Sequence, residues 1–401
     1  MTTAVHLLDN AVQHYGWGSP TRIHELLGTE PDGLPAAELW LGAHPSAPST
    51  TADGVALDAL VRSDPEAMLG RRVSDTFGPR LPFLLKVLAA ERALSLQVHP
   101  RPHAARAGFN RENRLGLPPG SPQRSFHDDQ HKPEMVVAVS QFEGLAGFRA
   151  PRAILALLEG LDGPLVAAVR DTLVADRSDR GMKQAFARLL AARSRAGCRA
   201  DIDATVASVQ ARLAAGSPYD RADATVLQLA EQHPGDPGAI ASLMLNRVTL
   251  EPGEAMFMPA GQVHAYLSGL GIEVMASSDN VLRAGLTTKL VDEAALVECA
   301  TFTPTPPVHP VLETAGNRGQ VHSFRAPVDE FALTVADVDA GESVALPAEG
   351  PRVVLCLEGK IALEHGDGPT VLRHGESVFV PHATGAVRVS GEGQLVCAWV
   401  P

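Results

Sequence analysis

The chain has 401 residues, of which 45% are hydrophobic and 20% are charged, and its formal net charge is −12 at pH 7. This length exceeds one ordinary hydrophobic core, so we expect two or three domains. The acidic balance argues against nonspecific binding to nucleic acid, which requires a basic surface. It still allows an anionic small-molecule substrate, because a pocket can be locally basic.

The cysteines and the apolar segments indicate the cellular setting. Four cysteines lie far apart and form no C-x-x-C motif, namely Cys198, Cys299, Cys356 and Cys397. We therefore expect reduced thiols in a cytoplasmic protein. No signal peptide is visible, and even the apolar run 81–90 is broken by Lys86, so we expect no contact with a membrane. A monomer is the default expectation, because no exposed pairing helix is evident.

Residues 1–60 contain short apolar pieces separated by Gly and Pro, and they hold two of the three tryptophans. The segment 15–18 reads Y-G-W-G, and Trp17 fits either a core corner or the rim of a pocket. We expect Trp40 in the core, Glu38 as a buried and paired carboxylate, and His44 in a structural role.

The segment Leu94–Pro100 alternates apolar and polar residues, which predicts a strand. Gln97 and His99 then project from the same face, because successive strand side chains point to opposite faces. An amide oxygen and an imidazole so placed can bind one metal ion. A second strand is expected over 83–88.

Residues 101–129 are polar and rich in Pro and Gly, so we expect a long loop, and long ordered loops are usually functional. The loop leads into His131-Lys132-Pro133-Glu134 and then into the β-rich segment 135–139. Glu134 is therefore expected at the start of a strand, with Lys132 beside it.

Residues 150–242 differ from both flanking parts, because Ala, Leu and Arg recur there at helical spacing. Glycines separate the periodic segments, which predict helices over 154–161, 165–173, 182–192, 202–213 and 222–230. Nothing in this insert suggests catalysis, and its basic residues are expected on solvated faces.

Strand character returns at residue 243, and residues 277–289 are expected to form an irregular polar loop. The pattern G-E-x-x-F-x-P occurs at 253–259 and again at 375–381, which predicts two related β-barrels. The second copy has Ala386 where the first has His264, so we expect one active barrel for each chain.

The motif G-x-x-x-F-x-P-x-G-x-x-H at 253–264 resembles the second half of the cupin pattern. In a jelly-roll barrel, strand residues that are distant in sequence converge on the interior. The expected metal ligands are then Gln97, His99, Glu134 and His264. This nitrogen and oxygen set suits one Zn²⁺, while Fe²⁺ or Mn²⁺ remain alternatives.

The sequence as a whole resembles the type I phosphomannose isomerases. The matching segments are 15–18, 38–45, 94–100, 131–134, 264–266 and 272–289. The resemblance implies a mainly β fold with two cupin-type jelly-roll barrels and an α-helical insert. Residues 1–149 and 243–316 would form the catalytic cupin, 150–242 the helical insert, and 317–401 a degenerate cupin.

The resemblance implies reversible conversion of D-mannose 6-phosphate to D-fructose 6-phosphate, an aldose–ketose isomerisation through a cis-enediol, with Zn²⁺ at the four ligands. Arg283 would stabilise the enediolate or bind the phosphate. Lys132 and Glu273 are alternative bases for the proton transfer. The remaining predicted site residues are His131 and Asp279 for ring opening, and Tyr266, Lys289 and Trp17 for substrate binding.

Several alternatives stay open at this point. Two of the candidate catalytic residues have a purely structural alternative. Glu273 would then only pair with Arg283, and Asp279 would only cap its loop. Phe126, Gln130, Ser277 and Thr288 depart from the family pattern, so an isomerase of another phosphosugar is possible. A cupin oxygenase that uses Fe²⁺, or a non-catalytic binder of sugar phosphates, would explain the same pocket less completely.

Overall fold

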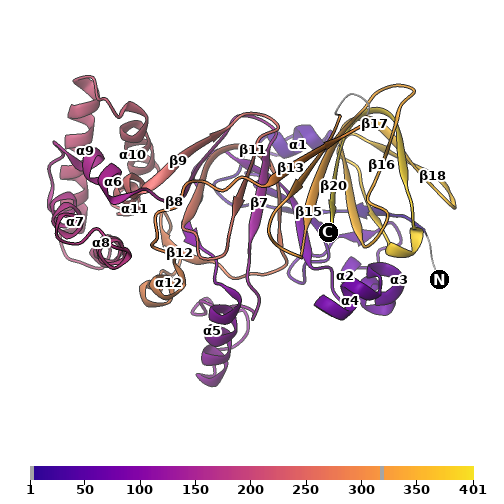
Figure 1. Cartoon of the computed structure of the whole chain (residues 1–401), viewed down its shortest axis with the longest axis horizontal. Coiled ribbons are helices and arrows are strands. Elements are labelled where there is room, and N and C mark those ends of the chain that lie inside the picture. The colour runs from indigo at the N-terminus through magenta and orange to yellow at the C-terminus, as the bar shows by residue number, and fades with distance from the viewer. Residues whose placement is uncertain (1–3, 317–319) are drawn as a thin grey trace.

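The computed structural model describes residues 4–316 and 320–401. Three parts lie along the long axis of the molecule in Figure 1: a helical end, a central β-barrel and a second β-barrel that ends the chain. The fold is mainly β with an α-helical insert, as the sequence predicts.

The central barrel is built from ten strands. They are β2 (Ala11–Gln13), β3 (Glu38–Gly42), β5 (Phe83–Ala90), β6 (Leu96–Val98), β7 (Glu134–Ala138), β8 (Phe142–Phe148), β9 (Leu245–Leu250), β10 (Ala255–Met258), β11 (His264–Ala276) and β12 (Leu282–Gly285). The long strand β11 pairs with β5, β6, β7 and β8, so it joins most of the barrel.

Alternate side chains of strand β5 pack into two different hydrophobic clusters. Phe83, Leu85 and Val87 pack into a core that continues into the second barrel, whereas Leu88 and Ala90 pack inside the central barrel. The period of two therefore directs Lys86 toward the barrel interior, although its neighbours in sequence are all apolar.

Two expectations for the loops are wrong. Residues 101–129 are not all loop, because α5 (Pro102–Arg114) occupies their first half. Pro102 starts this helix, and Gly108 lets it approach Phe126, whose ring atoms would lie 2.4 Å from a Cβ at that position. Within 277–289, the short strand β12 pairs with β6 and aligns this segment with the barrel.

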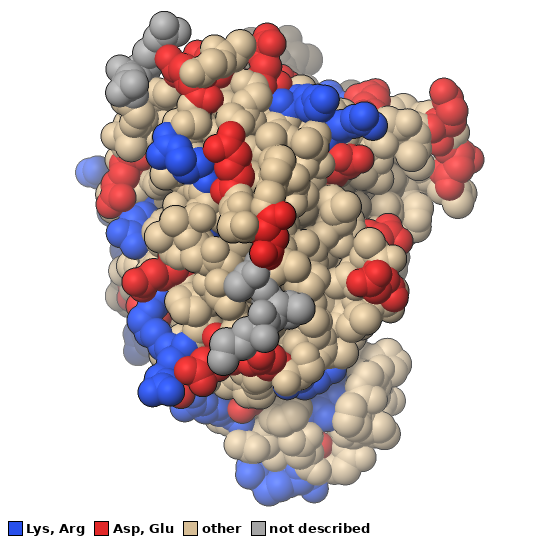
Figure 2. Space-filling view, turned by 90° about the vertical axis from the view of Figure 1, so that its right-hand side faces the viewer, with Lys and Arg blue, Asp and Glu red and all other residues tan. Residues whose placement is uncertain are grey.

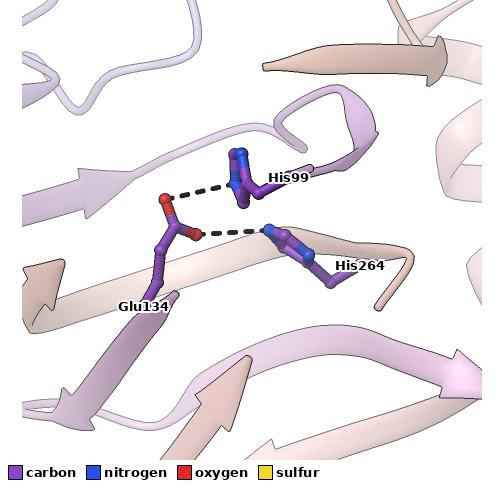
Figure 3. Close-up of side chains that lie close together, drawn as sticks. All are labelled: His99, Glu134 and His264. Carbon is purple, nitrogen blue, oxygen red and sulfur yellow. Dashed lines mark ion pairs between the residues drawn. The ribbon is translucent and has the colours of Figure 1, made fainter. Parts of the chain in front are cut away.

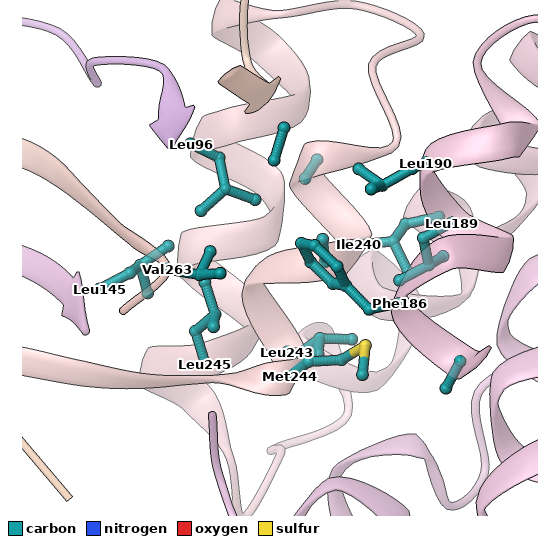
Figure 4. Close-up of a cluster of buried hydrophobic side chains, with 14 of the residues drawn as sticks. Leu96, Leu145, Phe186, Leu189, Leu190, Ile240, Leu243, Met244, Leu245 and Val263 are labelled. Carbon is teal, nitrogen blue, oxygen red and sulfur yellow. The ribbon is translucent and has the colours of Figure 1, made fainter. Parts of the chain in front are cut away.

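The insert is helical as expected. Its helices are α6 (Pro151–Leu158), α7 (Pro164–Ala175), α8 (Asp179–Ala192), α9 (Cys198–Ala214), α10 (Asp220–Gln232), α11 (Gly238–Ala241) and the 3-10 turn η1 (Ser242–Met244). Figure 4 shows Phe186 and Ile240 of the insert meeting Leu145 and Val263 of the barrel in one buried cluster. Continuous burial of apolar side chains fixes the insert against the barrel.

Ten strands of the described residues form the second barrel. They are β1 (His6–Asp9), β4 (Thr50–Thr51), β13 (Val311–Ala315), β14 (Val321–Arg325), β15 (Ala332–Val338), β16 (Ser343–Ala345), β17 (Arg352–His365), β18 (Gly368–Arg373), β19 (Ser377–Val380) and β20 (Arg388–Trp399). Strand β1 pairs with β19, so the first strand of the chain belongs to the last barrel, unlike the predicted boundary.

Short helices complete the fold. They are α1 (Arg22–Leu27), α2 (Leu57–Ser63), α3 (Pro65–Leu69), α4 (Arg71–Phe77), α12 (Glu293–Cys299) and the 3-10 turn η2 (His382–Thr384). Ile23, Val61, Met135, Phe331 and Val353 belong to one hydrophobic cluster, which therefore spans both barrels. The two barrels pack as a unit around it.

Within the described residues, no helix combines the length and the apolar character needed to cross a membrane. Figure 2 shows basic and acidic side chains interspersed on one face of the molecule, without a broad area of a single sign.

Candidate metal centre and active-site pocket

One cross-strand row carries three of the predicted site residues. Gln97 on β6 lies opposite His264 on β11 and, on its other side, opposite Arg283 on β12. Residues opposite each other in antiparallel strands share a face of the sheet, so all three side chains are directed alike. His99 follows β6 by one residue, and Glu134 begins β7.

His99, Glu134 and His264 converge inside the barrel, where each is at most 2% exposed. His99 Nε2 lies 3.2 Å from Glu134 Oε1, and His264 Nε2 lies 3.3 Å from Glu134 Oε2 (Figure 3). Their ligand atoms lie within 4.8 Å of one another, which is close enough to hold a single metal ion.

The outer nitrogens of both imidazoles fix their tautomers. Nδ1 of His99 donates to the carbonyl oxygen of Asn280 at 2.6 Å, and Nδ1 of His264 donates to the carbonyl of Gln262 at 3.0 Å. In its neutral form, each ring then presents the lone pair of Nε2 to the Glu134 carboxylate. Two lone pairs that face a carboxylate repel it unless a cation lies between them.

Two further observations agree with a cation at this point. Among the described residues, His99 Nε2 and Glu134 Oε2 are buried and make no hydrogen bond. Burial lowers the pKa of His99 to about 4, despite the opposing effect of Glu134, so this ring is neutral at pH 7. The donor set of two imidazoles and a carboxylate fits Zn²⁺.

Gln97 and Lys132 border the three converging side chains. The Gln97 amide nitrogen lies 3.4 Å from His264 Nε2, and rotation of the amide group would place its oxygen there as a ligand. Lys132 Nζ lies 3.1 Å from Glu134 Oε1. Burial raises the pKa of Glu134, but His99, which is protonated in the acidic range where this carboxylate titrates, and Lys132 outweigh it and hold that pKa well below its usual range.

A second cross-strand row lies beside the metal ligands. Glu273 on β11 is opposite Lys86 on β5, which is opposite Trp40 on β3. Lys86 Nζ lies 3.1 Å from Glu273 Oε2 and 3.5 Å from Glu38 Oε1, and 5.3 Å from the centroid of the Trp40 ring. Glu38 is thus the buried, paired carboxylate that the sequence suggests.

Two carboxylates, Glu38 and Glu273, contact the single ammonium group of Lys86, which explains the protonation of these groups. Burial alone would lower the pKa of Lys86, but Glu38 and Glu273 outweigh it and raise that pKa. Burial raises the pKa of Glu273, as does Glu134, while Lys86 opposes the rise. Tyr266 donates its hydroxyl proton to Glu273 Oε1 at 2.8 Å. Glu273 is therefore a carboxyl group with an unusually strong affinity for a proton.

Two of the proposed metal ligands, Gln97 and Glu134, and this row border one cavity of about 690 Å³. Most of the predicted substrate and catalytic residues line it: Trp17, Lys132, Tyr266, Glu273, Asp279, Arg283 and Lys289. Lys289 Nζ lies 5.6 Å from the centroid of the Tyr15 ring, which stacks on Trp17. Burial lowers the pKa of Arg283, and burial beside Arg283 lowers the pKa of Lys289. Arg283 and Lys289 therefore lie close enough to influence each other in the lining of the cavity.

The two residues proposed for ring opening have different positions. Asp279 borders the cavity, and its carboxylate accepts a hydrogen bond from Ser46 Oγ at 2.8 Å. His131 does not line the cavity, contrary to its predicted role, because Nε2 of its imidazole contacts Glu330 Oε1 of the second barrel at 2.5 Å.

Sequence reasoning missed Lys86 and Asn280. The signal for Lys86 was available, because it is the single charged residue of the buried strand β5. Asn280 is fully buried and donates to the carbonyl oxygen of Gln130 at 2.8 Å, while its own carbonyl orients His99. That role depends on tertiary contacts that no local pattern reveals.

Comparisons with known proteins agree with this geometry. Residues 5–151 match the family "Phosphomannose isomerase type I, catalytic domain", and residues 320–400 match "Mannose-6-phosphate isomerase, cupin domain". The mannose-6-phosphate isomerase of Salmonella typhimurium is 39% identical, with 97% of each chain covered. That of Bos taurus is 33% identical, with 88% of this chain and 87% of the relative covered.

Solved structures show the same fold over nearly the whole chain. A single-residue variant of the phosphomannose isomerase of Salmonella typhimurium matches with a TM-score of 0.89 at 35% identity, and 99% of each chain is covered. A zinc-bound mannose 6-phosphate isomerase matches with a TM-score of 0.88 at 36% identity and the same coverage. The chain belongs to the type I mannose-6-phosphate isomerase family.

Proposed function

We propose that this protein is a zinc-dependent isomerase that interconverts D-mannose 6-phosphate and D-fructose 6-phosphate. The observation that carries the proposal is the convergence of His99 and His264 on Glu134, beside a cavity that Glu134, Arg283 and Lys289 line. The names of the relatives at 39% and 33% identity support the same reaction.

Gln97, His99, Glu134 and His264 would hold the zinc ion. When bound, zinc supplies a Lewis acid beside O1 and O2 of the open sugar, without redox chemistry. Lys132 and Asn280 keep two of the ligands oriented, through Glu134 and His99 respectively.

The isomerisation moves one proton from C2 to C1, while the hydroxyl proton on O2 is lost and O1 gains one. Lys132 and Glu273 are the candidate groups for the carbon-bound proton, since both line the cavity. The raised pKa of Glu273, caused mainly by burial, makes it a stronger base than an exposed carboxylate. Lys86 and Tyr266 fix its orientation through direct contacts.

The charge that develops on the sugar oxygens and the charge of the phosphate need cationic partners. Arg283 lies in the same cross-strand row as Gln97 and His264, so its guanidinium is placed to stabilise an enediolate next to the metal. Lys289 lies farther out, against Tyr15, and is the better candidate for the phosphate.

We expect the zinc-loaded protein to convert mannose 6-phosphate to fructose 6-phosphate in D₂O with deuterium entering the carbon-bound positions. Mannose without phosphate should react with a kcat/KM at least about 10²-fold lower, because charge-assisted contacts are lost. A coupled assay and ¹H NMR measure both. Failure of the zinc-loaded, folded protein to convert mannose 6-phosphate would contradict the proposal, and preference for another phosphosugar would reassign the substrate.

A further inference from the structure

A side chain of the second barrel, Glu330, contacts the segment 130–134 that carries Lys132 and Glu134. Glu330 lies in the loop between β14 and β15. Its carboxylate oxygen Oε1 lies 2.5 Å from Nε2 of His131. The two side chains are 15% and 23% exposed, so the contact is largely shielded from water. His131 directly precedes Lys132, which pairs with the metal ligand Glu134.

Both partners of this contact are held in place by their surroundings. Phe331 and Met135, each adjacent to this region in sequence, belong to the hydrophobic cluster that spans the two barrels. Burial raises the pKa of Glu330, but the contact with His131 and its own loop's backbone N–H groups outweigh it and lower that pKa. The carboxylate is thus ionised at pH 7 in its contact with the imidazole.

Hydrogen bonds to the first barrel hold the backbone of segment 130–133 in place. The carbonyl oxygen of Gln130 accepts from Asn280 Nδ2 at 2.8 Å, and that of Pro133 accepts from the backbone N–H of Ala276 at 3.1 Å. These bonds hold the backbone on both sides of His131 and Lys132. The contact with Glu330 fixes the side chain that lies between them.

We propose that Glu330 is a positioning residue for the reaction: through His131 it sets the orientation of Lys132, and so completes a site that the first barrel does not build alone. The inference rests on the proposed isomerase function. It gives the second barrel, which lacks an imidazole at Ala386, a role in turnover in addition to packing.

An ion pair that served only for packing would have a different signature. Partly exposed pairs add little to stability, so its loss would leave kcat and the metal site unchanged. A partner that orients groups around a metal ligand typically changes activity by about tenfold or more when it is removed. We therefore expect Glu330→Ala to lower kcat about tenfold, with the KM for mannose 6-phosphate and the zinc content close to those of the wild type.

The experiment compares the zinc-loaded full chain with Glu330→Ala, Glu330→Gln and a control, Glu313→Ala. Glu313 also forms an ion pair in the second barrel, with Arg325 at 3.8 Å, but it lies away from the cavity. We expect Glu330→Gln, which keeps an acceptor oxygen for His131, to recover part of the lost kcat, and the control to match the wild type. Melting temperatures identify any variant that fails to fold.

A second measurement separates this inference from the proposed function. Cobalt replaces zinc in the same variants, and its visible absorption bands report the surroundings of the metal ligands. Shifted bands in Glu330→Ala support the contact even if the wild type acts on no phosphosugar, which would refute only the proposed function. A wild-type kcat and an unshifted spectrum in folded Glu330→Ala would overturn the inference, as would a change confined to KM.

Discussion

Replacing Arg283 with alanine is expected to lower kcat/KM about 10²- to 10³-fold while zinc stays bound. Removal of one preorganised donor to a developing oxyanion typically has an effect of this size. Arg283 lies opposite Gln97 in the sheet but coordinates nothing itself, so the metal ligands keep their geometry. Steady-state kinetics with mannose 6-phosphate and metal analysis of the same sample measure both quantities.

Two further variants make the Arg283 result specific. Arg283→Lys keeps the charge without the planar group, so we expect an intermediate loss. Arg180→Ala removes an exposed arginine of the helical insert, which pairs with Asp176, and should match the wild type. Near-normal turnover of Arg283→Ala would refute the assignment, and a rise in KM alone would make Arg283 a phosphate contact only.

Replacing Glu134 with glutamine is expected to remove both the zinc and the activity. The substitution keeps the shape of the side chain, but it replaces the carboxylate between the two imidazoles with a neutral amide and leaves Lys132 without its counter-charge. A Lewis acid is worth roughly 4 kcal/mol of transition-state stabilisation, so kcat should fall on the order of 10³-fold. Metal content by mass spectrometry and a coupled assay check the two losses together.

Asp223→Asn is the matched control for Glu134→Gln. Asp223 is likewise buried and paired, with Arg212, but it lies in the helical insert away from the cavity. Its variant should keep one equivalent of zinc even if its melting temperature falls. A Glu134→Gln protein with full zinc and turnover within tenfold of the wild type would show that Glu134 is not an essential ligand.

Much of the site could be predicted from local patterns. The alternation around Gln97 and His99 fixes their common face, and the motif G-x-x-x-F-x-P-x-G-x-x-H marks His264 as a ligand. These signals lie within single strands, where the backbone geometry determines the direction of each side chain. The helical insert could also be predicted from the sequence, because its apolar residues recur with a period of 3.6.

What local patterns missed depends on contacts between distant segments. The imidazole of His131 contacts the carboxylate of Glu330, which is 199 residues away in sequence. The assignment of residues 101–129 to a loop overlooked α5, since its polar composition conceals a buried face at Ala104, Ala105 and Gly108. Strand β1 joins the second barrel through a pairing with β19 that no sequence period encodes.

Removal and return of the metal tests the central claim most directly. The purified protein is assayed with mannose 6-phosphate as isolated, after treatment with a chelator, and after addition of one equivalent of zinc. We predict that activity disappears with the metal and returns with zinc, while the apo-protein stays folded by circular dichroism. Full activity in a folded, metal-free protein would contradict the proposed role of His99, Glu134 and His264, and no activity after zinc loading would contradict the isomerase itself.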